Sequence, residues 1–175
     1  MIITLSGMIA SGKGGVREAL ETKLNYASIG VGDTWRAKQK ELGDIHAINK
    51  YILDHPHLDR EMDEQTAQKA KGYENCIVDG RAQWYFLPES IKIFLDCTVE
   101  KAAERLFHAK RESEHYKDMD EALQQVQSRK LQDQERFQKL YDINIYDKNN
   151  YDLVIDTTNL TVEATVEQIL NYLQM

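Results

Sequence analysis

The chain has 175 residues, 42% of them hydrophobic, so it is long enough for one domain with a substantial core and too short for two independent ones. Charged residues of both signs make up 29%, which argues for a globular surface rather than a disordered chain, and no apolar run approaches the roughly 20 residues of a membrane span. The formal charge of −7 argues against general nucleic-acid binding, because a basic surface is what attracts the phosphate backbone.

Short apolar runs predict β-strands, and apolar residues at helical spacing predict the helices between them. In chain order, the predicted strands are residues 2–6, 27–29, 76–79, 91–95 and 151–155. The predicted helices follow the glycine-rich turn after the first strand, begin near Trp35, and cover residues 99–107, about 120–141 and about 162–173. Strands that alternate with helices predict an α/β fold with a parallel sheet covered on both faces, and the absence of a linker predicts a single domain.

Two stretches between these elements are polar enough to lie over a ligand cleft. Residues 33–72 predict two or three short helices, broken at His55-Pro56, and we interpret them as a flap with Asp33 as the N-cap of its first helix. Residues 108–118 lack any apolar periodicity, and we interpret them as a lid.

The cysteines and the N-terminus indicate an intracellular protein. Cys76 and Cys97 lie in predicted buried strands and do not form a metal-binding spacing, so we expect two reduced core thiols. No export signal follows the first methionine, so we expect a cytoplasmic monomer that does not associate with membranes.

A phosphate-binding loop is predicted between the first strand and the first helix. Residues 7–13 have the spacing G-x-x-x-x-G-K, in which glycines turn backbone N–H groups toward phosphate oxygens and the lysine reaches the β- and γ-phosphates. The residues expected to bind the phosphates of ATP here are Gly7, Ala10, Ser11, Gly12, Lys13, Gly14 and Gly15.

The position that usually holds a magnesium ligand is occupied by glycine. The serine or threonine hydroxyl that commonly follows the lysine is missing, because Gly14 and Gly15 stand there, and Ser11 precedes the lysine. We therefore expect nucleotide-associated Mg²⁺ to be held by water, nucleotide oxygens and nearby acidic groups, with no metal bound by the protein alone.

Arginines occur where a kinase needs them to stabilise phosphate charge. Arg36 follows Asp33 in the flap, and Arg81 follows Asp79 at the carboxyl end of the third strand, where parallel sheets bind ligands. Asp79 could orient Mg²⁺ through water or pair with Arg81.

The long helix offers a second charged group. Arg129, Asp133 and Arg136 share one face of it, and Asp133 could accept a hydrogen bond from a ribose hydroxyl while Arg136 binds phosphate. Arg129 and Asp133 could instead form a plain surface pair. Arg105 lies beside the lid and Arg111 lies in it, so both could contact ATP.

Taken together, these residues resemble the cytidylate kinases, especially the short archaeal-type members. The resemblance runs over nearly the whole chain and includes the segments IITLSG, SGKG, VGDTWR, VDGR, IFLD, KLYDINI and YDLVIDT. It implies a P-loop three-layer fold with a five-stranded parallel sheet, an acceptor flap and a lid, and ATP- and Mg²⁺-dependent phosphorylation of CMP and dCMP.

The resemblance also implies residue roles. Lys13 would act on the ATP phosphates, Asp79 would lie beside the acceptor, and Asp133 would bind its sugar. The arginines expected on the acceptor phosphate are Arg36, Arg81 and Arg136, and those expected in the lid are Arg105, Arg111 and Arg129. We expect catalysis to depend on Lys13, Arg81, Arg129 and Arg136.

One further departure concerns the base. Bacterial members have an acidic residue that helps to read cytosine where this chain has Ala82, so the base must be read from elsewhere, with Asp63, Gln65 and Gln83 as candidates. Trp84 could stack on a base, although a partly buried core position is the simpler interpretation.

Two alternatives remain. The chain could be a small P-loop kinase that acts on another monophosphate or metabolite. It could also be a catalytically silent nucleotide-binding protein, which the Gly14-Gly15 pair favours and the retained arginines disfavour.

Overall fold

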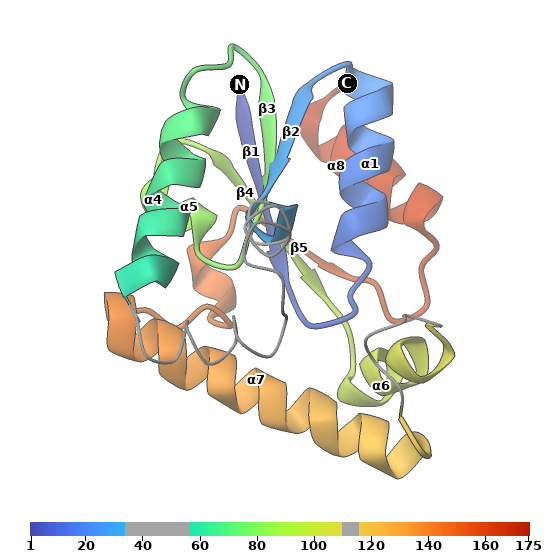
Figure 1. The fold of residues 1–175 in the computed structure, drawn as a ribbon. Coiled ribbons are helices and arrows are strands. Elements are labelled where there is room, and N and C mark those ends of the chain that lie inside the picture. Colours follow the sequence, from blue (N-terminus) through green and yellow to red (C-terminus); the bar gives the residue numbers. More distant parts are fainter. Residues whose placement is uncertain (34–56, 110–115) are drawn as a thin grey trace.

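The computed structural model describes residues 1–33, 57–109 and 116–175. It contains a five-stranded, wholly parallel sheet with the strand order β2-β3-β1-β4-β5, and helices lie on both of its faces (Figure 1). The strands are β1 (Ile2–Gly7), β2 (Ala27–Gly30), β3 (Cys76–Asp79), β4 (Ile91–Asp96) and β5 (Leu153–Asp156). The helices are α1 (Lys13–Leu24), α4 (His57–Ala70), α5 (Gln83–Phe86), α6 (Val99–His108), α7 (Met119–Tyr141), η1 (Lys148–Asn150) and α8 (Val162–Leu173). The predicted α/β fold is therefore confirmed.

The core has one apolar layer on each side of the sheet. On one side α1 and α8 pack on the sheet through side chains such as Val16, Leu20 and Ile169, all of which are buried. On the other side α6 and α7 enclose Phe94 and Val126, while α4 covers Val78. Burial of these side chains removes apolar area from water and supplies the main driving force for folding.

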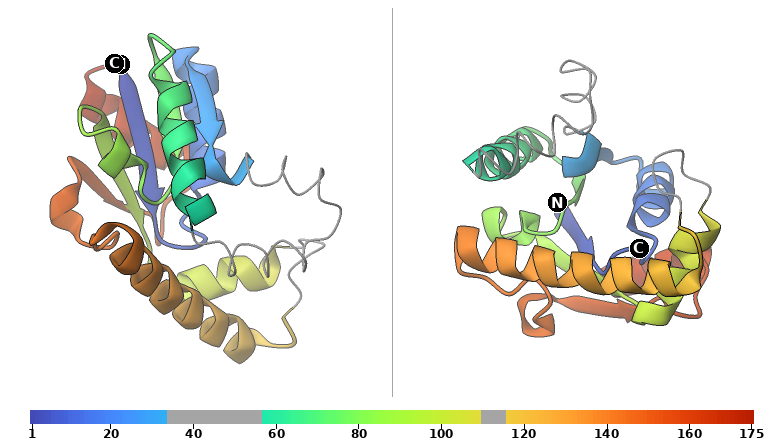
Figure 2. Two further views of the ribbon diagram at one scale, coloured as in Figure 1. Left: turned by 60° about the vertical axis from the view of Figure 1, so that its left-hand side comes forward. Right: turned by 60° about the horizontal axis from the view of Figure 1, so that its bottom comes forward.

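The long helix α7 crosses the end of the sheet at which the strands finish. Figures 1 and 2 show it running past that end beside α6, below the loop that follows β1. Asp133 of α7 bonds to Arg81, which follows β3. Val126 of α7 belongs to the same apolar cluster as Met8 in the loop after β1, so α7 lies at the end of the sheet where ligands bind in open parallel sheets.

Most element boundaries agree with the sequence pattern, with four differences. α5 and η1 were not predicted, because four and three residues are too few to show a helical period. The last strand begins at Leu153 instead of residue 151, because Tyr151 caps η1 and donates its hydroxyl to the carbonyl oxygen of Ile145. The predicted flap is described only for α4, a single helix that begins at His57, and its earlier part, including the His55-Pro56 break, lies outside the described residues.

Other expectations concern the described residues as well. Cys76 and Cys97 are buried free thiols, as predicted. Within the described ranges, no helix has both the length and the apolar character needed to cross a membrane. Most of the predicted lid, residues 110–115, lies outside the description.

Candidate active site

The loop after β1 is shaped by two glycines. Gly7 has φ +152°, and a Cβ at this position would lie 2.2 Å from the carbonyl oxygen of Leu95. Gly12 has φ +92° and caps α1 without a side-chain hydrogen bond, so the first N–H groups of the helix are left for a ligand. The predicted phosphate loop therefore has the backbone form that anion binding requires.

This loop forms one wall of a cavity of about 540 Å³. The opposite walls come from the residues that follow β2 and β3 and from α6 and α7. The predicted site residues that line it are Ala10, Ser11, Gly12, Lys13, Gly14, Gly15, Asp33, Asp79, Arg81, Arg105 and Arg129. Arg36 and Arg111 lie outside the described residues, so their predicted roles are not addressed by the structure.

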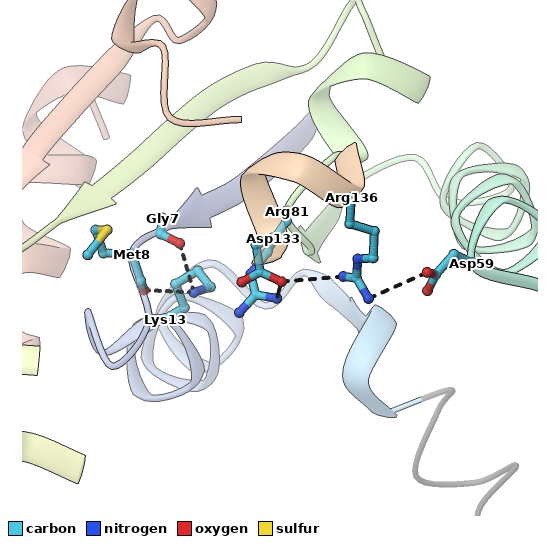
Figure 3. A network of polar contacts seen from close by, with 7 residues as sticks. All are labelled: Gly7, Met8, Lys13, Asp59, Arg81, Asp133 and Arg136. Carbon is cyan, nitrogen blue, oxygen red and sulfur yellow. Dashed lines mark hydrogen bonds and ion pairs between the residues drawn. The ribbon is translucent and has the colours of Figure 1, made fainter. Parts of the chain in front are cut away.

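Lys13 points back into the loop. Its Nζ donates to the carbonyl oxygens of Gly7 and Met8, at 3.4 and 3.2 Å (Figure 3). Burial lowers the pKa of Lys13, and the nearby carboxylate of Asp79 opposes this shift. Because these two carbonyl contacts are weak, the ammonium group of Lys13 can exchange them for the phosphate oxygens of a nucleotide, which are stronger partners.

A row of alternating charges extends from the cavity toward α4. Arg81 Nη1 lies 2.8 Å from Asp133 Oδ1, Arg136 Nη2 lies 3.6 Å from the same oxygen, and Arg136 Nη1 lies 3.4 Å from Asp59 Oδ2 (Figure 3). Arg81 thus pairs with Asp133, and the alternative that it pairs with Asp79 is not what the structure shows. Asp133 accepts a hydrogen bond from Arg81, forms an ion pair with Arg136 and is buried, so it is not part of a plain surface pair.

Two polar atoms in this row have no hydrogen-bond partner within the described part of the chain. They are Oδ2 of Asp133 and Nε of Arg136, and both are buried. A buried polar atom without a partner costs about 1–3 kcal/mol. A ligand that pairs with both atoms would recover this free energy, so the row has the properties of a binding site.

Arg17 is a cavity residue that the sequence did not reveal. Its guanidinium pairs with Asp33 and lies where a Cβ of Gly30 would be. Residues 31–33 are already helical, so Asp33 lies within the helical turn and the prediction that it is an N-cap is wrong. Arg17 follows Lys13 by four residues, so helical spacing on α1 was the available signal.

Arg105, which we predicted to be a lid arginine, forms a hydrogen bond to the backbone of the phosphate loop. Its Nη1 donates to the carbonyl oxygen of Ala10 at 3.1 Å and to Thr157 Oγ1 at 3.2 Å. Thr157 donates in turn to the carbonyl oxygen of Ser11 at 3.0 Å. Thr157 was missed because it follows the last strand, 146 residues from the loop it supports, and no local pattern connects the two.

None of the three candidates for reading the base lines the cavity that the described residues form beside the phosphate loop. Asp63 and Gln83 are buried and bond to each other at 2.9 Å, and Tyr141 donates to the second carboxylate oxygen of Asp63 at 2.7 Å. Gln65 is exposed and bonds to Glu61. We therefore assign Asp63 and Gln83 to a polar network that joins α4, α5 and α7.

Trp84 is a core residue, as the simpler interpretation expected. Its side chain is only 9% exposed, and its indole N–H donates to the carbonyl oxygen of Arg81 at 3.1 Å. This hydrogen bond fixes the turn from which the Arg81 side chain leaves, so Trp84 supports the site without facing it.

Replacement of Tyr141 by phenylalanine is expected to destabilise the protein more at high than at low pH. Burial raises the pKa of Asp63 to about 6, and the hydrogen bonds from Tyr141 and Gln83 oppose the shift. Because this pKa is higher in the folded than in the unfolded chain, Asp63 adds stability as the pH falls through 6 toward 4, and it is ionised above that range. Loss of the tyrosine hydroxyl should therefore lower the free energy of unfolding by about 1–3 kcal/mol near pH 8, and by less near pH 5.

Urea unfolding at both pH values measures this difference, with Tyr172→Phe as the exposed control. Equal destabilisation at the two pH values would show that Tyr141 acts only through packing.

Comparison with known proteins agrees with this geometry. The profile of the cytidylate kinase-like family matches residues 2–159. A cytidylate kinase of Pyrococcus abyssi is 33% identical over 166 residues, which cover 94% of this chain and 88% of that protein. A cytidylate kinase of Methanocaldococcus jannaschii is 33% identical over 170 residues, covering 94% of this chain and 92% of that protein.

A longer relative has a different name. An S-adenosylmethionine-dependent nucleotide dehydratase of Lacinutrix mariniflava is 30% identical over 174 residues, which are 98% of this chain but only 36% of that protein. Among solved structures, shikimate kinase from Bacteroides thetaiotaomicron has a TM-score of 0.69 at 18% identity and covers 100% of this chain and 99% of its own. At that identity the likeness concerns the fold alone.

Proposed function

The chain belongs to the cytidylate kinase-like family and is a nucleoside monophosphate kinase, and we propose that it transfers the γ-phosphoryl group of ATP to CMP or dCMP. The observation that carries the proposal is that the phosphate loop and Arg81 line the same cavity. A kinase of this type must hold a donor and an acceptor phosphate side by side, and positioning with charge stabilisation supplies most of its catalysis. The loop and Arg81 are the two anion-binding walls that such a reaction needs.

In this proposal each wall has its own task. Backbone N–H groups at the start of α1 and the ammonium of Lys13 hold the ATP phosphates, while Arg81 holds the acceptor phosphate and Asp133 accepts a hydrogen bond from its sugar. An oxygen of the acceptor phosphate attacks the γ-phosphorus, and the bond to the β-phosphate oxygen breaks, so that ADP leaves. No side chain needs to remove a proton, because the acceptor phosphate is already a nucleophile.

Further arginines would share the charge that spreads over the equatorial oxygens. Arg129 lines the cavity. The resemblance to cytidylate kinases implies that Arg36 binds the acceptor phosphate and that Arg111 belongs to the lid. Arg105 would act through the loop that it holds.

The residues present fit a magnesium ion that arrives with the nucleotide. Asp79 lines the cavity, and a Cβ added at Gly14 would meet no atom within 4 Å, so the start of α1 leaves room for a hydrated ion. When bound, Mg²⁺ neutralises part of the phosphate charge. Asp79 would orient water in its hydration shell.

A hydroxyl is expected to be tolerated at Gly14 and not at Gly15. A Cβ at Gly15 would lie 3.2 Å from Cγ2 of Val162, at the start of α8, whereas the space at Gly14 is open. Gly15→Thr should therefore lower the free energy of unfolding by about 1–3 kcal/mol through overpacking, and Val162→Ala should relieve part of it. Gly14→Ser should leave stability within about 0.5 kcal/mol and lower the Mg²⁺ concentration that gives half-maximal velocity.

Thermal unfolding and Mg²⁺ titrations of the three variants measure these effects. A stable Gly15→Thr protein would contradict the close packing of α1 on α8. An unchanged Mg²⁺ requirement in Gly14→Ser would mean that the position after the lysine does not face the ion.

A coupled assay of ADP release tests the proposed function, with ATP and Mg²⁺ and with CMP, dCMP, UMP and AMP as separate acceptors. We expect the highest kcat/KM with CMP or dCMP. Turnover confined to AMP or to UMP would mean that this monophosphate, and not CMP, is the acceptor. No turnover on any of the four would overturn the proposal.

A further inference from the structure

A kinase that prefers cytosine needs a group that reads the base, and none of the three candidates named from the sequence lines the cavity formed by the described residues. Ala82 stands where bacterial members have an acidic residue, and it is fully buried. Asp63 and Gln83 are bonded to each other in the interior. Among the described residues outside these expectations, Asp59 belongs to the row of charges in Figure 3.

The order of groups in the row matches the order of groups in a nucleotide. Lys13 and Arg81 lie at the cavity end, Asp133 and Arg136 come next, and Asp59 on α4 is the most distant member (Figure 3). If the acceptor phosphate lies at Arg81 and the sugar at Asp133, the base extends along the row to Arg136 and Asp59. These two residues then present a donor and an acceptor side by side.

The charge along the row also favours a neutral group at that end. Arg136 lies between two carboxylates, Asp59 and Asp133, so its positive charge is already balanced. A phosphate dianion would meet repulsion from both carboxylates, whereas a neutral base edge would meet hydrogen-bonding groups of both kinds. The buried Nε of Arg136, which has no partner among the described residues, is a donor free for such an edge.

Asp59 is placed to be this acceptor, in contrast to its neighbour Asp63. The two are four residues apart and share one face of α4. Asp63 is held by Tyr141 and Gln83, whereas Asp59 forms an ion pair with the guanidinium of Arg136. Its side chain is 12% exposed, so a ligand can still reach it. An ionised carboxylate only accepts hydrogen bonds, and it therefore selects a ligand group that donates them.

Building on the proposed function, we infer that Asp59 is a specificity residue that accepts a hydrogen bond from the exocyclic amino group of the acceptor base. Cytosine carries an amino group where uracil carries a carbonyl oxygen, so the carboxylate attracts the first base and repels the second. Arg136 donates to the ring nitrogen beside that amino group. This placement differs from the phosphate role that the resemblance implied for Arg136.

Asp59→Asn tests the inference, because asparagine keeps the shape and presents an amide that can donate to the uracil carbonyl. We expect kcat/KM for CMP to fall by about tenfold or more, kcat/KM for UMP to stay or rise, and the ratio of CMP to dCMP to remain unchanged. The loss for CMP should lie mainly in KM, because Asp59 is remote from the transferred phosphoryl group. Glu61→Gln removes a charge from the exposed face of the same helix and is the matched control.

Each outcome decides one question. An unchanged preference for CMP over UMP in a folded Asp59→Asn protein overturns the inference while the native activity leaves the proposed function intact. A changed ratio of CMP to dCMP would place Asp59 at the sugar and also overturn it. If Asp59→Asn does not fold, Asp59→Glu keeps the carboxylate and should keep the preference, whereas Asp59→Ser should lose it. Failure of the native chain on every acceptor would be a failure of the proposed function itself.

Discussion

Lys13→Ala is expected to lower kcat by about 10³-fold, the largest effect of any single substitution in this chain. The ammonium of Lys13 lies inside the phosphate loop, where its partners are the carbonyl oxygens of Gly7 and Met8. When ATP is bound, the same group faces the negative charge that develops during transfer. An interaction that strengthens in the transition state appears in kcat, so its removal cannot be offset by more substrate.

The same substitution should not destabilise the fold. Burial lowers the pKa of Lys13, which means that the site disfavours its charged form when no phosphate is present. Thermal unfolding without nucleotide should therefore show an equal or higher Tm for Lys13→Ala than for the native chain. Lys23→Ala, an exposed substitution in the last turn of the same helix, is the control and should change neither property.

Steady-state kinetics with ATP and CMP, together with unfolding, check both halves of this expectation. A Lys13→Ala protein with more than about a tenth of the native kcat would contradict the assignment of the phosphate loop. A large fall in Tm would mean instead that Lys13 has a structural role through its carbonyl contacts.

Features encoded in local sequence were predicted well. The phosphate loop combines a glycine spacing with an apolar run before it and a helical period after it, and all three signals are local. Asp79 and Arg81 were proposed as site residues for a related reason, because the end of a parallel strand is a fixed place in the fold. The structure brings these residues around one cavity, as expected.

Pairings between distant elements could not be predicted in the same way. Arg81 and Asp133 are 52 residues apart, and nothing near either residue indicates that they meet. Asp63 was a candidate for reading the base. In the structure it is buried and bonds to Gln83 of α5 and Tyr141 of α7, so it belongs to an interior network. Asp59 shares its helix face and was not considered, since a single sequence does not reveal which carboxylate is buried and which faces a partner.

The pairing of Arg81 with Asp133 leads to the second large expectation. Arg81→Ala should lower kcat/KM for the acceptor by about 10²–10³-fold while the KM for ATP changes little, because Arg81 lies on the acceptor wall of the cavity. It also removes the 2.8 Å partner of Asp133 and leaves that buried carboxylate with Arg136 at 3.6 Å. The acceptor site thus loses a phosphate ligand and the fixed position of its sugar ligand together.

A double-mutant cycle separates these two losses. If Arg81 acts partly by orienting Asp133, then Asp133→Asn in the Arg81→Ala background should cost much less than it does in the native chain, and Arg81→Lys should recover only part of the activity. The lysine keeps the charge but has no planar fork, so it can meet the phosphate or Asp133 and not both at once. Arg60→Ala is the control, since Arg60 pairs with Glu64 on the exposed face of α4. Fully additive effects in the cycle would mean that the two residues act on the acceptor independently, and their contact would then be a feature of the empty site alone.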